Sequence, residues 1–153
     1  MKIAIFSVIL LALITAYSFT SRSKTTTIKS DKEEGIHFFN GTWNQALIKA
    51  NKENKIIFLD TYATWCGPCK LLKNKTFKDK NVADYFNEHF INVAVDAEEG
   101  EGIVLAEKYG VEAYPTLIFI NSDGTLIGKT MGYYKSPNFL DLGKKVIQSQ
   151  KEK

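Results

Sequence analysis

The sequence predicts an α/β fold in which a mixed central β-sheet, made of parallel strands plus one antiparallel hairpin, is flanked by helices on both faces. First, residues 56–59 form an unbroken apolar run, which is typical of a strand buried on both sides. Second, helical and strand-like patterns alternate after that run. Third, turn-forming residues at 121–124 join two strand-like segments. Strands separated by helices are expected to run parallel, whereas a tight turn makes its pair antiparallel.

The first elements of the domain are a short edge strand, a helix and the central strand. The edge strand is predicted at 36–39. A helix is predicted at 42–54, because Thr42 suits its N-terminus and apolar residues recur at helical spacing. The central strand follows at 55–62. The helix is expected to contribute core residues to one face of the sheet, namely Trp43, Ala46, Leu47 and Ala50.

The later elements alternate until a closing helix. Helical patterns occupy 67–73 and 81–88. In the second of these helices Val82, Tyr85 and Phe86 are expected to face inward. The next helix ends before Gly110, which suits a left-handed cap. The remaining predicted elements are a strand at 90–95, a helix at 100–109, strands at 115–120 and 125–131, and a helix at 137–148.

The composition indicates one globular domain with room for a short targeting segment. The chain has 153 residues, of which 44% are hydrophobic and 24% are charged. A formal net charge of +3, spread over dispersed lysines, excludes the clustered basic face of a nucleic-acid-binding protein. The acidic run at 98–101 and the lysines at positions 70, 73, 75, 78 and 80 are interpreted as solvated faces.

The N-terminus has the form of a secretory signal. Lys2 precedes an apolar stretch at 3–14, and the small residues Ala16 and Ser18 suit a cleavage site. An uncleaved membrane anchor is the alternative, because the apolar stretch approaches the length of a spanning helix. We therefore expect a signal peptide or anchor at 1–18, a flexible spacer at 19–34 and a folded domain at 35–150. The protein is then exported, to the periplasm or the outer face of the cytoplasmic membrane.

The chemistry of the chain is concentrated in its two cysteines, Cys66 and Cys69. A bond between them would close a very small loop and contribute little to stability, so a structural staple is disfavoured. Cys66 lies at the predicted start of a helix, where free N–H groups and the helix dipole favour a thiolate. Cys69 lies on the same side, one turn deeper, and can attack a mixed disulfide formed at Cys66. The spacing predicts two-step thiol–disulfide exchange.

A zinc site is the competing use of a cysteine pair, and it needs two more ligands. The histidines are His37 and His89, and they do not form a spaced ligand pair. We expect no metal and no bound cofactor. Between the cysteines, Pro68 suits the opening turn of a helix, and Gly67 leaves room for a substrate backbone.

Residues 58–70, with the sequence FLDTYATWCGPCK, resemble the active-site segment of the thioredoxin family. The tripeptide Tyr114-Pro115-Thr116 resembles the cis-proline loop of that family, and the likeness runs from residue 36 to residue 148. Residues 73–90 are more similar to secreted thioredoxin-like proteins and to the periplasmic carboxy-terminal domain of DsbD-type electron carriers. The resemblance implies a thioredoxin fold and a monomeric thiol–disulfide oxidoreductase acting on protein disulfides.

The resemblance also implies roles for individual residues. Asp60 matches a buried carboxylate whose pKa is raised by desolvation and which exchanges a proton with Cys69. Pro115 is expected to be cis, so that the Tyr114 backbone lies beside the thiols and pairs with an extended substrate. The implied catalytic residues are Cys66, Cys69, Asp60 and Pro115, and the implied substrate-binding residues are Trp65, Gly67, Pro68, Tyr114 and Gly132.

Three residues depart from the family pattern. Many thioredoxins have a lysine beside the buried carboxylate at the position of Asn92, so the proton transfer is expected to be tuned differently here. Tyr62 replaces a common tryptophan, and Tyr114 is bulkier than the usual aliphatic residue, so the substrate range is expected to differ as well.

The direction of exchange is expected to be reductive, because a Gly-Pro pair between the cysteines resembles reducing thioredoxins. A reductase outside the cytoplasm requires a membrane protein as its electron donor. A disulfide isomerase or oxidant of the same fold and a non-catalytic interaction module are the alternatives. The intact dithiol motif together with Pro115 argues against the non-catalytic module.

Overall fold

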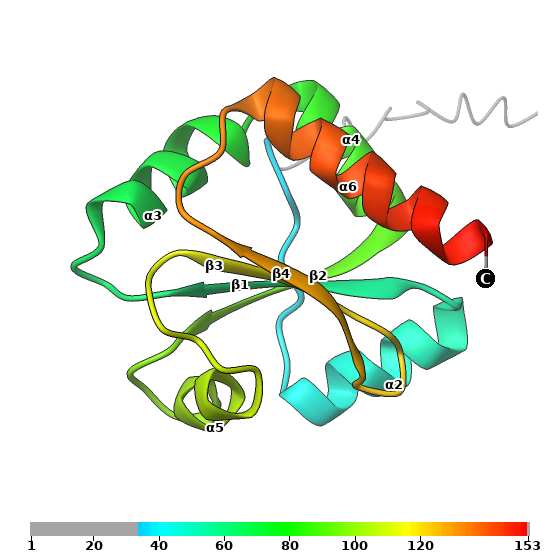
Figure 1. Cartoon of the computed structure of the whole chain (residues 1–153), viewed down its shortest axis with the longest axis horizontal. Coiled ribbons are helices and arrows are strands. Elements are labelled where there is room, and N and C mark those ends of the chain that lie inside the picture. The colour runs from blue at the N-terminus through cyan, green and yellow to red at the C-terminus, as the bar shows by residue number, and fades with distance from the viewer. Residues whose placement is uncertain (1–33, 153) are drawn as a thin grey trace, which may run out of the picture. The chain divides into compact units, whose positions relative to one another are not determined.

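The computed structural model describes residues 34–152 (Figure 1). The segment predicted to be a signal or an anchor lies outside the described residues, as does the predicted spacer except for Glu34. No helix within the described part is long and apolar enough to cross a membrane. The sheet has four strands in the order β2-β1-β3-β4, with bounds β1 Ile56–Tyr62, β2 Phe90–Asp96, β3 Thr116–Ile120 and β4 Leu126–Met131.

The sheet is mixed, as predicted, but it contains one parallel pair and two antiparallel pairs. β1 is parallel to β2, and β3 is antiparallel to both β1 and β4. The expectation that β3 runs parallel to β1 is therefore wrong. The reason is the path of helix α5 (Glu101–Lys108), which Figure 1 shows nearly end on, across the strand direction. Because α5 does not carry the chain back along the sheet, β3 begins at the end where β2 finished.

Helices cover both faces of the sheet, which confirms the predicted layers (Figure 1). Helix α2 (Trp43–Glu53) and α5 pack on one face. The opposite face is covered by α3 (Gly67–Leu71), its π-helical continuation η1 (Leu72–Thr76), α4 (Lys80–His89) and α6 (Ser136–Lys151).

Helix α2 begins at a capping box, as its sequence predicts. The Thr42 side chain accepts a hydrogen bond from the Gln45 backbone, and the Gln45 side chain accepts one from the Thr42 backbone. Ala46 and Ala50 are fully buried against the sheet. Trp43 is half-buried rather than fully enclosed, and its ring packs edge-on against Tyr109 with ring centroids 6.0 Å apart.

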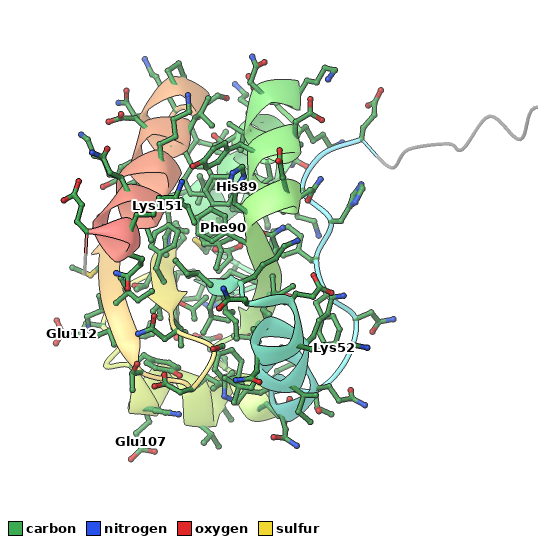
Figure 2. All side chains as sticks on the ribbon, turned by 90° about the vertical axis from the view of Figure 1, so that its right-hand side faces the viewer. Lys52, His89, Phe90, Glu107, Glu112 and Lys151 are labelled. Carbon is green, nitrogen blue, oxygen red and sulfur yellow. A yellow bond between two sulfur atoms is a disulfide. The ribbon has the colours of Figure 1, made fainter. Side chains whose placement is uncertain are left out.

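The core beneath α4 and α6 is made mainly of phenylalanine. Phe86 of α4 stacks on Phe139 of α6 with ring centroids 4.4 Å apart. A Cβ atom at Gly143 would lie 2.8 Å from the Phe86 ring, so this glycine permits the close approach of the two helices. Figure 2 shows α4 and α6 side by side, with His89 and Phe90 at the junction of α4 and β2. The buried rings of this core are Phe58, Phe77, Phe86, Phe90, Phe119 and Phe139.

The inward-facing residues predicted for α4 are partly confirmed. Val82 and Phe86 are fully buried. Tyr85 is half-buried and stacks on His89, with ring centroids 4.1 Å apart. The turn at 121–124 and the hairpin that it closes are confirmed, and Gly124 takes a positive φ of 85° there.

The predicted edge strand at 36–39 is reduced to a single parallel bridge between Phe38 and Asn92. Side-chain amides replace part of the backbone hydrogen bonding that a regular strand would have here. The His37 amide donates to Asn87 Oδ1 at 2.8 Å, and Asn87 Nδ2 donates to the Gly35 carbonyl oxygen at 3.1 Å. Asn92 Nδ2 lies 3.4 Å from the His37 carbonyl oxygen. The Phe39 amide donates to the Asn92 carbonyl oxygen of β2 at 2.7 Å, but the Ile36 amide donates to the Phe77 carbonyl oxygen and the His37 amide to a side chain, so no regular strand forms.

Candidate active site

The two cysteines lie where β1 leads into α3. Cys66 is the N-cap of α3, and Pro68 lies in its first turn. The Cys69 amide donates a hydrogen bond to Cys66 Sγ at 3.1 Å. The two residues form a disulfide, with their Cα atoms 5.3 Å apart. The predicted placement of Cys66 at a helix N-terminus and of Cys69 one turn deeper is confirmed.

Aromatic residues cover the disulfide. Cys66 is 2% exposed and Cys69 is 7% exposed, so the predicted attacking cysteine is the less accessible of the two. Tyr62 and Tyr114 pack against the small cluster that the cysteines form with Ala63. Aromatic rings therefore border the cluster that holds the disulfide.

Trp65 forms the exposed part of this aromatic cover. Trp65 is 67% exposed, and its ring packs edge-on against Tyr114, with ring centroids 5.9 Å apart. Trp65 Nε1 donates to Glu98 Oε2 at 3.0 Å, and the Glu98 amide donates to Asp96 Oδ1 at 2.9 Å. The acidic run at 98–101 is thus more than a solvated face, because Glu98 orients the indole ring.

The Tyr114–Pro115 peptide bond is cis, as the family resemblance implies. Thr61 Oγ1 of β1 donates to the Thr116 carbonyl oxygen at 2.8 Å, and the Gly132 amide donates to the Pro115 carbonyl oxygen at 2.8 Å. These bonds fasten the proline loop between β1 and the end of β4. The role of Thr61 was not predicted from the sequence, in which a hydroxyl inside a buried strand is its only signal.

The residues predicted to bind substrate surround the disulfide at different depths. Gly67 and Pro68 are exposed, and a Cβ atom at Gly67 would have no heavy atom within 4 Å among the described neighbours. Gly132 is half-buried and has a positive φ of 92°. The structure thus brings the predicted glycines and Pro68 to the same loops as the dithiol and Pro115.

Asp60 is buried in β1, and it shares a cavity with Cys69. The residue is 6% exposed, and its Oδ1 atom has no hydrogen-bond partner among the described residues. Burial raises the pKa of the Asp60 carboxyl from 3.8 to about 7, and the positive charge of Lys73 lowers it in part. The cavity holds about 410 Å³ and is lined by Asp60, Cys69, Lys70, Lys73, Tyr62 and other residues. The predicted burial of Asp60 is confirmed, and desolvation by that burial is the cause of the raised pKa.

Asn92 has a structural task in this chain. It is buried, and its Nδ2 atom lies within hydrogen-bond distance of the Phe86 carbonyl oxygen and Asn87 Oδ1, at 3.3 Å each. The same carboxamide fastens the segment around His37. Asn92, at the position of the family's lysine, therefore connects the edge strand β2 to the segment around His37 and to the end of α4.

Metal binding has no support within residues 34–152. No group of three His, Cys, Asp or Glu side chains in this range could hold a metal ion. The ring of His89 stacks on Tyr85, and its Nδ1 atom lies 3.0 Å from the Tyr85 carbonyl oxygen.

Together, the fold and the site define a class of protein. A cysteine pair caps a helix after the central strand, faces a cis-proline loop and has a buried carboxyl behind it. This is a dithiol oxidoreductase with its redox-active pair at Cys66 and Cys69.

The comparisons identify the family. The model of the thioredoxin-like domain family matches residues 43–147, and the chain belongs to this family. Thioredoxin H4 of Arabidopsis thaliana is 35% identical over 109 residues, which span 71% of this chain and 83% of that protein. The chain is a thiol–disulfide oxidoreductase.

Two solved structures extend the comparison. A candidate disulphide isomerase from Bacteroides thetaiotaomicron is 47% identical and superposes with a TM-score of 0.68, covering 76% of this chain and 96% of that one. The oxidised carboxy-terminal domain of DsbD from Neisseria meningitidis is 28% identical, with a TM-score of 0.59, and covers 71% of this chain and 98% of that one.

The pKa of Asp60 predicts how stability depends on pH. Between about pH 4 and pH 7 the folded protein keeps a proton on Asp60 that the unfolded chain has released, so this residue lowers stability progressively as pH rises through that range. We expect Asp60→Asn to stabilise the oxidised protein by about 2–4 kcal/mol at pH 8 and by much less at pH 4.5. Urea unfolding at both pH values measures the difference. An equal effect at the two pH values would contradict the assignment.

Proposed function

We propose that this protein is an exported enzyme that reduces protein disulfides outside the cytoplasm by exchange through Cys66 and Cys69. The observation that carries the proposal is the shared geometry of the site. The disulfide lies beside the cis-proline loop, and Cys69 and the buried Asp60 line one cavity. Cys69 thus shares a cavity with a candidate proton acceptor, and Tyr114 of the proline loop packs against the cluster that holds both sulfurs.

In the first step the reduced Cys66 attacks a substrate disulfide. A new bond forms between Cys66 Sγ and one substrate sulfur, and the second substrate sulfur leaves with the electron pair and takes up a proton. The Cys69 amide, which donates to Cys66 Sγ at 3.1 Å, favours the thiolate that attacks. The mixed disulfide at Cys66 is the intermediate.

In the second step Cys69 attacks Cys66 Sγ. The Cys69 S–H bond breaks, and the proton passes to the Asp60 carboxylate, whose pKa of about 7 suits transfer near neutral pH. The Cys66–Cys69 bond forms as the bond to the substrate breaks, so the substrate gains two electrons and the enzyme becomes the disulfide. An external dithiol must then reduce the enzyme again.

The proline loop and the exposed indole form the substrate surface in this proposal. An extended substrate segment pairs with the Tyr114 backbone, as a strand added to a sheet edge. Trp65 provides the apolar contact, while Gly67, Pro68 and Gly132 leave room for the substrate backbone. The exposed side chains of Met131 and Tyr133 continue this surface.

The reductive direction is supported by the Gly-Pro pair between the cysteines and by the likeness to thioredoxins. Outside the cytoplasm it requires a membrane protein that passes electrons outward to the cysteine pair, and we propose such a donor as a partner of this monomeric enzyme. Disulfide isomerisation is the second candidate, because the Bacteroides thetaiotaomicron relative is described as a candidate isomerase.

The roles of the two cysteines can be separated by trapping. We expect Cys69→Ser to accumulate a mixed disulfide on Cys66, because the attacking thiol remains and the resolving thiol is gone. Non-reducing electrophoresis and mass spectrometry of the captured species measure it. The control is Cys66→Ser, which should trap nothing. Trapping by Cys66→Ser alone would reverse the two roles.

The redox potential decides the direction. We expect the cysteine pair to have a potential below about −230 mV, close to the value of about −270 mV for thioredoxin. Equilibration of the purified protein with dithiothreitol or glutathione buffers measures it. A potential above about −180 mV, in the range of isomerases and oxidants, would replace the reductase by the isomerase or oxidant.

Fractionation of the source cells tests export. We expect the protein outside the cytoplasm, either soluble with its N-terminus near Phe19 or retained in the membrane with residues 1–19 attached. N-terminal sequencing distinguishes the two forms. Full-length protein in the soluble cytoplasm would refute the proposed location.

A further inference from the structure

Lys73 belongs to the cavity that Asp60 and Cys69 share. Its side chain lines that cavity, although the residue as a whole is exposed. Lys73 follows Cys69 by four residues, so the two side chains project from the same side of the helix, about one turn apart. Lys73 therefore brings a positive charge to the cavity that holds the buried Asp60 carboxyl. The interpretation of Lys73 as part of a solvated face is incomplete.

The backbone that carries Lys73 is held on both sides. Leu72 and Thr76 of η1 are fully buried. Thr76 Oγ1 donates to the Tyr134 carbonyl oxygen at 2.6 Å, and the Phe77 amide donates to the Leu72 carbonyl oxygen at 2.9 Å. The second bond belongs to the π-helical turn, a feature that is frequent at functional sites. The start of the Lys73 side chain is thus fixed beside the cavity.

The sheet places no positive charge next to Asp60. Its neighbour across β2 is Ala94, and its neighbour across β3 is Leu117. On β1 itself Tyr62 lines the cavity, and its pKa is raised by burial and then by the carboxylates of Asp96 and Asp60. Tyr62 is therefore neutral near pH 7.

The cations that face Asp60 come from the active-site helix. Lys70 of α3 and Lys73 of η1 both line the cavity. Of the two, it is the charge of Lys73 that lowers the pKa of Asp60. Many thioredoxins have a lysine at the position of Asn92, beside the buried carboxylate. In this chain the Asn92 carboxamide instead bonds to the backbone around Phe86 and His37.

We propose that Lys73 is a positioning residue for the second exchange step, in which its ammonium group stabilises the charged form of Asp60 and so keeps that carboxylate able to accept the proton of Cys69. The inference rests on the proposed function, because it assigns Lys73 to the same reaction. In that step Lys73 itself neither gains nor loses a proton. The Cys69 proton goes to Asp60, and the two electrons go to the substrate sulfur.

The test compares the full chain with Lys73→Gln, with the charge-retaining Lys73→Arg and with Lys75→Gln. Lys75 is the matched control, because it is an exposed lysine of the same π-helical segment that does not line the cavity. The first readout is the titration of the Asp60 carboxyl carbon by NMR in the reduced protein. The second is the rate of insulin reduction with dithiothreitol between pH 5.5 and pH 8.5.

We expect Lys73→Gln to raise the Asp60 midpoint by about half a unit or more, and to move the acid limb of the rate profile the same way. Below the midpoint, the rate then falls about threefold, because fewer carboxylates are available to take the proton. Lys73→Arg and Lys75→Gln should keep the wild-type midpoint and profile. An unchanged midpoint in Lys73→Gln, or an equal shift in Lys75→Gln, would overturn the inference.

The two proposals fail in different ways. If the wild-type chain does not reduce insulin at any pH, the proposed function fails. The Asp60 midpoint still decides whether Lys73 acts on the carboxylate. If the wild-type chain is active and Lys73→Gln has the wild-type rate profile, the role of Lys73 is refuted and the proposed function stands.

Discussion

The burial of β1 between two neighbouring strands and two helical layers is the constraint on which the site depends. Along this strand Phe58 packs into the phenylalanine core, Leu59 packs into the core on the opposite face, and Asp60 returns to the first side. Thr61 then bonds to the proline loop. Because side chains of a strand alternate in direction, a register slip of one residue would exchange these environments. Anchoring β1 in both cores therefore fixes the carboxyl, the proline loop and the start of α3 together.

The elements that could be predicted are those with a strong local signal. The apolar run of β1, the capping residue of α2 and the turn at 121–124 each determine a local structure with little help from the rest of the chain. The direction of β3 could not be obtained in this way, because it depends on how α5 lies relative to the sheet. The edge strand at 36–39 failed for a related reason, since Asn87 and Asn92 satisfy its backbone groups.

The candidate site shows the same division. Cys66, Cys69, Asp60 and Pro115 were found because their spacing or their likeness to a family marks them. Glu98 and Lys73 reach the site from apparently solvated positions, and their residue types alone carry no signal. Thr61 lies in the buried strand β1, where its hydroxyl is the only signal. Thr61 is 55 residues from its partner Thr116, and Glu98 is 33 residues from Trp65. Contacts of that kind arise from the packing of elements, which periodicity does not encode.

The aromatic cover over the disulfide has a consequence for the flow of electrons. A fully exposed disulfide exchanges readily with small thiols, and its redox state follows the bulk thiol pool. Here both sulfur-bearing residues are more than nine-tenths buried, with Tyr114 packed against them and Trp65 packed against Tyr114. A thiol that approaches the pair thus meets little exposed sulfur surface, and its access depends on the rings of Tyr114 and Trp65. Steric shielding therefore joins the chemistry of the sulfurs in setting how fast a thiol exchanges with this pair.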